Sequence, residues 1–292
     1  MVFIPITIAA ATFQVARNAT QRTLMGAGGP WGATLVRFLY GLPFTAVFLA
    51  IAWMVWPSST LTPSAFFFTA SAVGGASQIG ATAALLSAMQ RSSFALGTAF
   101  QQSLLPFTSL IGFFVFGDVL SPLQAVGIAV VTLGVGVLSW PRDGVHGDWS
   151  GAWFGLLAGA CFAVSNNAFR QAGLSLGDSP AALRGITTVL TVQAMQSAAL
   201  IAALAVLDRT SLIAAFTNWK PSMRAGFFGA AASACWFTAL AMAPAGPVRA
   251  VGVVEMPLAA LAGQRLFSEK PTTLQWVVGA VTALGVVWAA LG

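Results

Sequence analysis

The chain has 292 residues, of which 58% are hydrophobic and 7% charged, and its formal net charge is +6. A soluble domain carries about 25% charged residues, so this composition excludes a water-soluble fold and indicates an integral membrane protein. The positive charge does not indicate a nucleic-acid-binding protein, because the thirteen lysines and arginines are scattered among apolar stretches and form no phosphate-binding patch.

The first expected helix, residues 2–22, becomes polar toward its end. Its last turns carry Gln14, Arg17, Asn18, Gln21 and Arg22 close to helical spacing. This pattern favours a helix with one face toward a solvated cavity. Residues 1–16 contain no charge, so the stretch lacks the basic region of a secretory signal and is expected to be retained.

Nine further apolar stretches follow, each of about the 20 residues that a membrane-spanning helix needs. Six of them begin with a proline, where the missing N–H has no helical partner to lose. Thr62, Ser121 and Ser179 are the expected caps of three helices. The ten expected helices are 2–22, 30–56, 63–90, 93–117, 121–140, 150–173, 179–207, 219–243, 245–267 and 271–291.

The chain matches itself when it is shifted by 151 residues. The aligned pairs are Pro106 and Pro257, Phe116 and Phe267, Asp118 and Glu269, Leu123-Gln124 and Leu274-Gln275, and Leu133-Gly134 and Leu284-Gly285. A slightly shorter offset also places Asn18 and Arg22 over Asn166 and Arg170. We therefore predict two five-helix halves, residues 1–140 and 150–292, joined by a loop at 141–149. An odd number of crossings inserts the second half in the opposite sense, as an inverted repeat.

Glu255 is the one carboxylate deep within an expected span, two residues before Pro257. Such an acid is a candidate proton carrier or a site for a substrate ammonium group. The alternative is a carboxylate satisfied by freed backbone donors or by Arg249. Pro106 and Pro257 each remove one helical hydrogen bond and are candidate hinges, or else static kinks. Arg37 and Arg184 lie near helix starts, where they either attract a carboxylate or extend to the membrane interface.

The ends of the two halves resemble each other and resemble the drug/metabolite transporter superfamily, specifically its ten-helix EamA-type exporters. They read FGDVLSPLQAVGIAVVTLGVGVL at 116–138 and FSEKPTTLQWVVGAVTALGVVW at 267–288. The layout is most similar to YddG-type exporters of aromatic amino acids. The resemblance implies a basket of helices around a central cavity, with helices one, three, four, six, eight and nine lining it and helices five and ten outside.

Amide side chains on the lining helices are candidates for binding a substrate. An unpaired polar group in hydrocarbon costs several kcal/mol, so it tends to face water, a ligand or another polar group. Hydrogen bonds that only hold the helices together are an equally good interpretation. With Trp236, whose ring offers a flat apolar surface, the candidates are Gln14, Asn18, Gln78, Gln101, Gln102, Asn166 and Asn167.

Together, these features predict a secondary transporter that exports amino acids, aromatic or other neutral, or similar small metabolites by alternating access. The chain lacks nucleophile-elbow, zinc-protease and nucleotide-binding motifs, so we expect no enzyme, cofactor or metal, and protons are a candidate coupling ion. An exporter of nucleosides, sugars or drugs is the alternative. A membrane enzyme acting on lipid-linked substrates is a distant one, since only Asp143, His146 and Asp148 cluster near an interface.

The expected location is the bacterial inner membrane, where the protein acts as a monomer. Ten of the thirteen basic residues lie on the side of the first, third, fifth, seventh and ninth loops or the adjoining helix ends. Because cytoplasmic loops carry an excess of lysine and arginine, both termini are predicted outside. Trp31, Trp56, Trp140, Trp149 and Trp219 are expected at the membrane interfaces.

Overall fold

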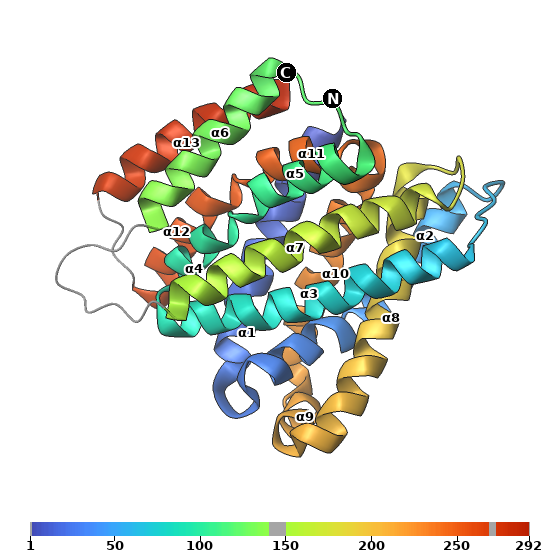
Figure 1. Ribbon diagram of the computed structural model, residues 1–292. Helices are drawn as coiled ribbons and strands as arrows, with labels where there is room; N and C mark the ends of the chain where they lie inside the picture. The colour runs from blue at the N-terminus through green and yellow to red at the C-terminus, as the bar shows by residue number, and fades with distance from the viewer. Residues whose placement is uncertain (1, 140–149, 269–272, 292) are drawn as a thin grey trace.

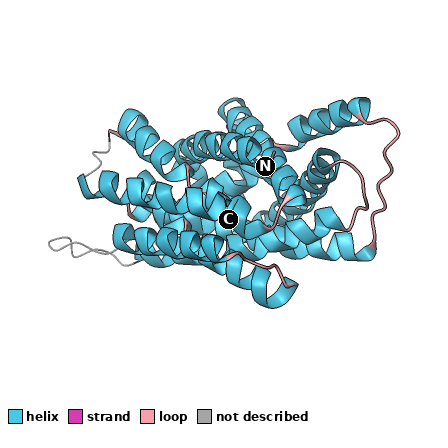
Figure 2. Cartoon of the chain, turned by 90° about the horizontal axis from the view of Figure 1, so that it is seen from above, coloured by secondary structure: helices cyan, strands magenta, loops and turns pink. Residues whose placement is uncertain are grey.

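The computed structural model describes residues 2–139, 150–268 and 273–291, and every regular element in this part of the chain is a helix (Figure 1, Figure 2). The predicted all-helical architecture is confirmed. The helices are α1 (Phe3–Leu39), α2 (Leu42–Val55), α3 (Ala65–Arg91), α4 (Phe94–Gln101), α5 (Leu104–Phe116), α6 (Pro122–Ser139), α7 (Ser150–Leu174), α8 (Ala181–Leu207), α9 (Arg209–Thr217), α10 (Trp219–Met242), α11 (Ala245–Gly252), α12 (Glu255–Phe267) and α13 (Thr273–Leu291).

The described helices have the dimensions and the surface of a multi-pass membrane protein. Six helical segments within the described residues are long and apolar enough to cross a bilayer. Large apolar side chains stand on the outside, among them Phe114 with 76% of its surface exposed and Leu207 with 82%. A soluble monomer rarely exposes extensive apolar patches, whereas a lipid-facing surface requires them.

The beginning of the chain differs from the expected pair of helices at 2–22 and 30–56. Helix α1 continues through residues 23–29 and bends at Gly29, whose φ of 55° is accessible to glycine and is followed by Pro30. The expected second helix is interrupted at Tyr40 and Gly41, between α1 and α2. Pro43 explains this interruption, because its ring excludes the helical hydrogen bond to the carbonyl four residues earlier.

Two expected helices, 93–117 and 245–267, are each broken in the middle. The first is divided into α4 and α5 at Gln102 and Ser103, and the second into α11 and α12 at Val253 and Val254. Each break includes the residue four positions before a proline: Gln102 precedes Pro106, and Val253 precedes Pro257. Because proline has no N–H, it cannot donate to the carbonyl of that residue as the next turn of an α-helix would. The break residues of the two helices are 151 positions apart, the same offset that aligns the sequence with itself.

The broken helices also end alike. Gly117 ends α5 with a φ of 68°, and Ser268 ends α12 with a φ of 55°, so both residues have the left-handed helical backbone conformation. Each cap donates its backbone N–H to a glycine carbonyl inside its helix, Gly112 in α5 and Gly263 in α12. Both pairs again differ by 151 residues, so the equivalence of these segments extends from sequence to backbone geometry.

Three helix pairs dominate the packing. Helix α3 packs along α7, α1 packs along α10, and α6 packs along α13 at one edge of the molecule (Figure 1). Glycines permit the close approach of α7 to the break between α4 and α5. A Cβ at Gly155 would collide with Phe100, and one at Gly159 would lie 2.8 Å from the backbone nitrogen of Leu104. Gly155 and Gly159 therefore lie in an interface between α7 and the segment of α4 and α5.

The starts of the helices follow local side-chain chemistry. Ser121 accepts from the backbone N–H of Gln124 at 3.1 Å while the Gln124 side chain accepts from the backbone N–H of Ser121 at 3.0 Å, a capping box at the start of α6. The cap of α3 is Ser64, not Thr62 as expected. The expected cap Ser179 instead donates to the carbonyl of Thr60, which fastens two loops together.

Two further features concern the connections. The segment between α8 and α10, expected as a loop, contains the short helix α9, which Asp208 caps by accepting from the backbone N–H of Ser211 at 3.1 Å. The predicted connecting loop at 141–149, with Asp143, His146 and Asp148, lies outside the described residues, and so do Trp140, Trp149 and Glu269.

Candidate functional site

Glu255 lies at the centre of a buried hydrogen-bond network. It is the first residue of α12, directly after the break, and its side chain is fully buried. Its carboxylate accepts hydrogen bonds from Gln14 Nε2 at 2.6 Å, Asn18 Nδ2 at 3.3 Å and Gln102 Nε2 at 3.4 Å. Gln14 and Asn18 come from α1, and Gln102 comes from the break between α4 and α5. Two distant parts of the chain therefore meet at this acid of α12.

The network extends from the carboxylate through the far ends of the two α1 amides. Gln14 Oε1 accepts a hydrogen bond from Trp236 Nε1 of α10 at 2.8 Å. Asn18 Oδ1 accepts from Arg17 Nη2 at 2.6 Å and from Arg17 Nε at 3.1 Å. Gln14 and Asn18 thus use both of their polar ends, which fixes their orientation relative to Glu255.

Three arginines are buried at or beside this network. Arg17, Arg37 and Arg249 have 1%, 2% and 4% of their surface exposed. Arg249 stacks on Trp236, with its Cζ 3.9 Å from the ring centroid. Both Arg17 and Arg249 interact electrostatically with Glu255.

Arg37 connects to the same group from the second segment of α1. Its positive charge is close enough to that of Arg17 to be repelled by it, and it donates from Nη1 to Thr82 Oγ1 of α3 at 2.8 Å. The two arginines flank Gly229 of α10, where an added Cβ would lie 3.2 Å from Arg37 Cγ and 3.7 Å from Arg17 Cδ. We call Arg17, Arg37 and Arg249 the buried arginine cluster.

The break in α11 and α12 suits the charges on either side of it. Arg249 is in the last turn of α11 and Glu255 in the first turn of α12. The C-terminal end of a helix carries about half a negative charge and the N-terminal end about half a positive charge, so both side chains lie at the favourable end. A continuous helix would lack these two ends, and the break therefore stabilises charge at this depth.

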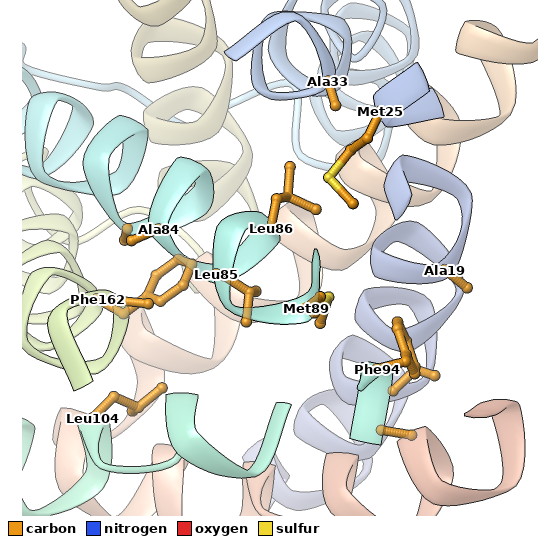
Figure 3. Close-up of a cluster of buried hydrophobic side chains, with 14 residues drawn as sticks. Ala19, Met25, Ala33, Ala84, Leu85, Leu86, Met89, Phe94, Leu104 and Phe162 are labelled. Atoms are coloured by element: carbon orange, nitrogen blue, oxygen red, sulfur yellow. The ribbon is translucent and has the colours of Figure 1, made fainter. Parts of the chain in front are cut away.

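Two apolar clusters enclose the network along the direction of α1 and of α11 with α12. Met25 and Ala259 belong to the first cluster, and Ala10 and Val248 to the second. Gln14 and Asn18 lie between Ala10 and Met25 in α1, and Glu255 lies between Val248 and Ala259. Figure 3 shows part of the first cluster, in which aliphatic and aromatic side chains of several helices pack together. Its labelled members are Ala19, Met25, Ala33, Ala84, Leu85, Leu86, Met89, Phe94, Leu104 and Phe162.

Of the residues singled out from the sequence, the structure joins five by hydrogen bonds: Gln14, Asn18, Gln102, Trp236 and Glu255. The other amides do not join them. Gln78 of α3 accepts from Gln196 of α8 at 2.9 Å, and Asn167 of α7 donates to the carbonyl of Thr108 in α5 at 3.2 Å. These two hold helices together. Gln101 has no partner for either polar atom among the described residues, and Asn166 has none for Nδ2.

Some expectations need correction. Arg37 does not extend to the interface but is buried. Arg184 is half-buried, and it donates from Nη1 and Nη2 to the carbonyls of Gly177 and Ala241, each at 3.3 Å. Trp153 of α7 has 68% of its surface exposed, whereas Trp236 is buried.

Arg17 was not among the predicted site residues, although the sequence carried a signal for it. It shares the polar face of α1 with Gln14, Asn18 and Gln21, all buried, and an arginine at that spacing belongs with the amides and not with the following loop. Among the described residues no group of three or more histidine, cysteine, aspartate or glutamate side chains is placed to hold a metal ion.

Comparison with known proteins supports the fold alone. No family model matches the chain, and no curated protein matches it. A solved structure described only as the crystal structure of a protein is similar over 99% of this chain and 96% of its own, with a TM-score of 0.65 and 18% sequence identity. The two structures therefore share their helical fold over almost the whole length of both chains.

Proposed function

We propose that the protein is a secondary transporter that exports amino acids, aromatic or other neutral, or similar small metabolites across the bacterial inner membrane. The observation that carries the proposal is the polar network around Glu255, buried at a break in a helix and enclosed by apolar clusters. A charged residue at membrane depth is costly and marks a functional site by default. Broken helices near the middle of the membrane are the binding sites of many transporters.

We further propose ten crossings arranged as two inverted five-helix repeats. Loops assigned to the same face contact each other: Thr62 N donates to Leu176 O at 3.3 Å, and an added Cβ at Gly151 would lie 3.4 Å from Ser92 Cβ. Thr62 and Leu176 follow the second and the sixth crossing, respectively. Ser92 follows the third crossing, and Gly151 comes after the fifth. Such pairings agree with loops that alternate between two faces along the chain.

The packing agrees with this symmetry. The third and sixth crossings are α3 and α7, and the eighth is α10. The first crossing is the part of α1 before Gly29, and the remainder of α1 begins the second. Exchange of the two halves converts one pair into the other, and both pairs pack extensively. The pair α6 and α13, the fifth and tenth crossings, is converted into itself, as expected for helices beside a pseudo-twofold axis.

The two apolar clusters suit gates of an alternating-access cycle. The first cluster includes Met25 and Ala259, and the second includes Ala10 and Val248, so the network residues of α1 and of α12 lie between members of the two clusters along the chain. Opening either cluster would expose the network to one face only. Pro106 and Pro257 would serve as hinges, because the broken backbone next to each lacks a continuous hydrogen-bond ladder.

The proposed orientation keeps the termini outside. Burial of Arg17, Arg37 and Arg249 removes them from the charges that set topology, since they do not lie in loops. Arg170 and Arg184 then remain on the side of the termini. On the opposite face, the described basic residues are Arg22, Arg91, Arg209, Lys220, Arg224 and Arg265. The excess still favours that face as cytoplasmic.

The proposal is tested with purified protein in liposomes. We expect exchange of labelled threonine, methionine or phenylalanine across the membrane. Nucleosides, sugars and drugs are included in the same panel, because they are the alternative substrates. If no amino acid crosses the membrane but a nucleoside, sugar or drug does, the proposed substrate class is wrong and the proposed transport activity is retained.

Glu255 is tested separately as the proton carrier. Glu255→Gln keeps the side-chain volume and removes the titratable group, so we expect exchange to persist while any dependence on a proton gradient disappears. Asp178→Asn is the matched control, because Asp178 is exposed in a loop. Unchanged gradient dependence in the Glu255 variant would exclude Glu255 from proton transfer.

A further inference from the structure

The buried arginine cluster is not balanced by the acids that the structure describes. Glu255 is the one acidic side chain among the buried residues of the described chain, against three buried guanidinium groups. The remaining described acids, Asp118, Asp178 and Asp208, are at least partly exposed and lie in loops. Two positive charges in excess therefore remain at membrane depth.

The other partners of the cluster are neutral. Arg17 donates to the Asn18 amide, Arg37 donates to the Thr82 hydroxyl, and Arg249 stacks on Trp236. The C-terminal end of α11 offsets about half a charge at Arg249. Hydroxyls, amides and an aromatic face reduce the cost of burying a guanidinium, but they do not neutralise it.

Unused donors remain on the same side chains. Nε of Arg37 and Nε of Arg249 are both buried and have no hydrogen-bond partner among the described residues. The same holds for Nε of Arg170 and Arg184, but their side chains are only partly buried and lie outside the cluster. The guanidinium group is the donor that best fits a carboxylate, because its planar N–H groups can bond both oxygens at once. The unpaired donors and the excess positive charge both favour the binding of an anion.

We infer that the transported substrate is an organic anion whose carboxylate binds the buried arginine cluster of Arg17, Arg37 and Arg249. The inference rests on the proposed transport function and places the substrate among its similar small metabolites, as an anion, instead of among the neutral amino acids. A zwitterionic amino acid would bring a carboxylate together with an ammonium group, which the arginines repel. An N-acylated amino acid or a dicarboxylate would bring only negative charge, and Glu255 would then hold the cluster together between binding events.

The inference is tested by binding of one hydrocarbon skeleton in three charge states to the full-length protein in detergent. The probes are N-acetylphenylalanine, phenylalanine and phenylalanine amide, with the matching leucine series, glutarate and sulfate. Thermal midpoints measured over a concentration range give each dissociation constant. We expect the N-acetyl anion or glutarate to bind roughly tenfold or more tightly than the zwitterion, and the cationic amide to bind least.

Variants assign the preference to the cluster. Arg249→Gln and Arg37→Gln should abolish the discrimination by charge, and Arg249→Lys should retain it. Arg184→Gln, which changes a half-buried arginine outside the cluster, should leave it unchanged. The inference is overturned if the zwitterion or the cation binds the wild-type protein as tightly as the anions, or if none of the probes shifts the midpoint. The wild-type series gives this answer even if a variant fails to fold.

The same probes separate this inference from the proposed transport function. Anion binding without flux of any probe in liposomes would keep the anion site and remove the transporter. Flux of phenylalanine or leucine with no preference for anions would keep the transporter and remove the anion site.

Discussion

At the scale of single residues, the site is a chain of polar side chains that orient one another. Gln14 links Trp236 to Glu255, and Asn18 links Arg17 to the same carboxylate. Each link uses a donor on one side and an acceptor on the other, so removing one member leaves a buried partner unpaired. An unpaired buried group costs about 1–3 kcal/mol, more than the net value of a typical hydrogen bond.

The indole N–H of Trp236 provides a direct measure of this coupling. Trp236→Phe keeps an aromatic face for Arg249 and deletes the hydrogen bond to Gln14 Oε1. We expect the folded protein to lose about 1–3 kcal/mol of stability, which lowers its thermal midpoint by at least about 2 °C. Trp219→Phe is the control, because Trp219 is 52% exposed. Equal midpoints for the two variants would show that the indole bond does not support the network.

The residues of the site were predictable where a polar type stood out against an apolar background. Gln14, Asn18, Gln102 and Glu255 are such residues, and they meet in the structure. The sequence could not separate them from Asn167, whose amide only joins α7 to α5. Which amides share a partner depends on the rotation of each helix about its axis, and packing between distant segments determines that rotation.

At the scale of helices, the positions of most elements followed from apolar length and proline, whereas the breaks did not. A proline within a helix predicts a kink, but it does not predict whether the helix bends or divides. In α4 with α5 and α11 with α12 the chain divides, with short-range bonds from Leu105 N to Gln102 O at 3.0 Å and from Met256 N to Val253 O at 2.9 Å. Tight packing of α7 against the first break is a tertiary feature that sequence periodicity does not contain.

The prolines themselves are expected to matter for movement. Pro257→Ala would restore the missing donor and allow α11 and α12 to join as one helix, which stiffens the proposed hinge. We expect exchange in liposomes to slow roughly tenfold while binding of the substrate is retained. Pro122→Ala, in the first turn of α6, is the control because proline costs little there. Exchange at the wild-type rate would make the break a static feature.

The left-handed ends of α5 and α12 give a matched pair of stability predictions. Gly117 has no atom within 4 Å of an added Cβ, so Gly117→Ala would be penalised for its φ of 68° alone. Ser268 already carries a side chain at a φ of 55°. We expect Gly117→Ala to destabilise the protein and Ser268→Gly to stabilise it, each by about 1 kcal/mol. Thermal midpoints in detergent measure both, and shifts of the same sign would contradict the backbone argument.

At the scale of the whole molecule, the account depends on two equivalent halves that face opposite ways. The offset of 151 residues relates sequence identities, helix breaks and left-handed caps. Glu255 and the buried arginine cluster lie where α1 packs against α10, α11 and α12. An inverted pair of halves can open toward either face while the site between them keeps its residues.

The most direct measurement is the sidedness of equivalent loops. Single cysteines replace Ser58, after α2, and Arg209, after α8, in a chain whose Cys161 and Cys235 have been changed to serine. Both positions are exposed. The inverted arrangement, with the termini outside, predicts that a membrane-impermeant maleimide labels the cysteine at 58 in intact cells. It predicts that the cysteine at 209 is labelled only after the membrane is opened. Labelling of both positions from the same face would contradict the inverted arrangement and, with it, the proposed transport mechanism.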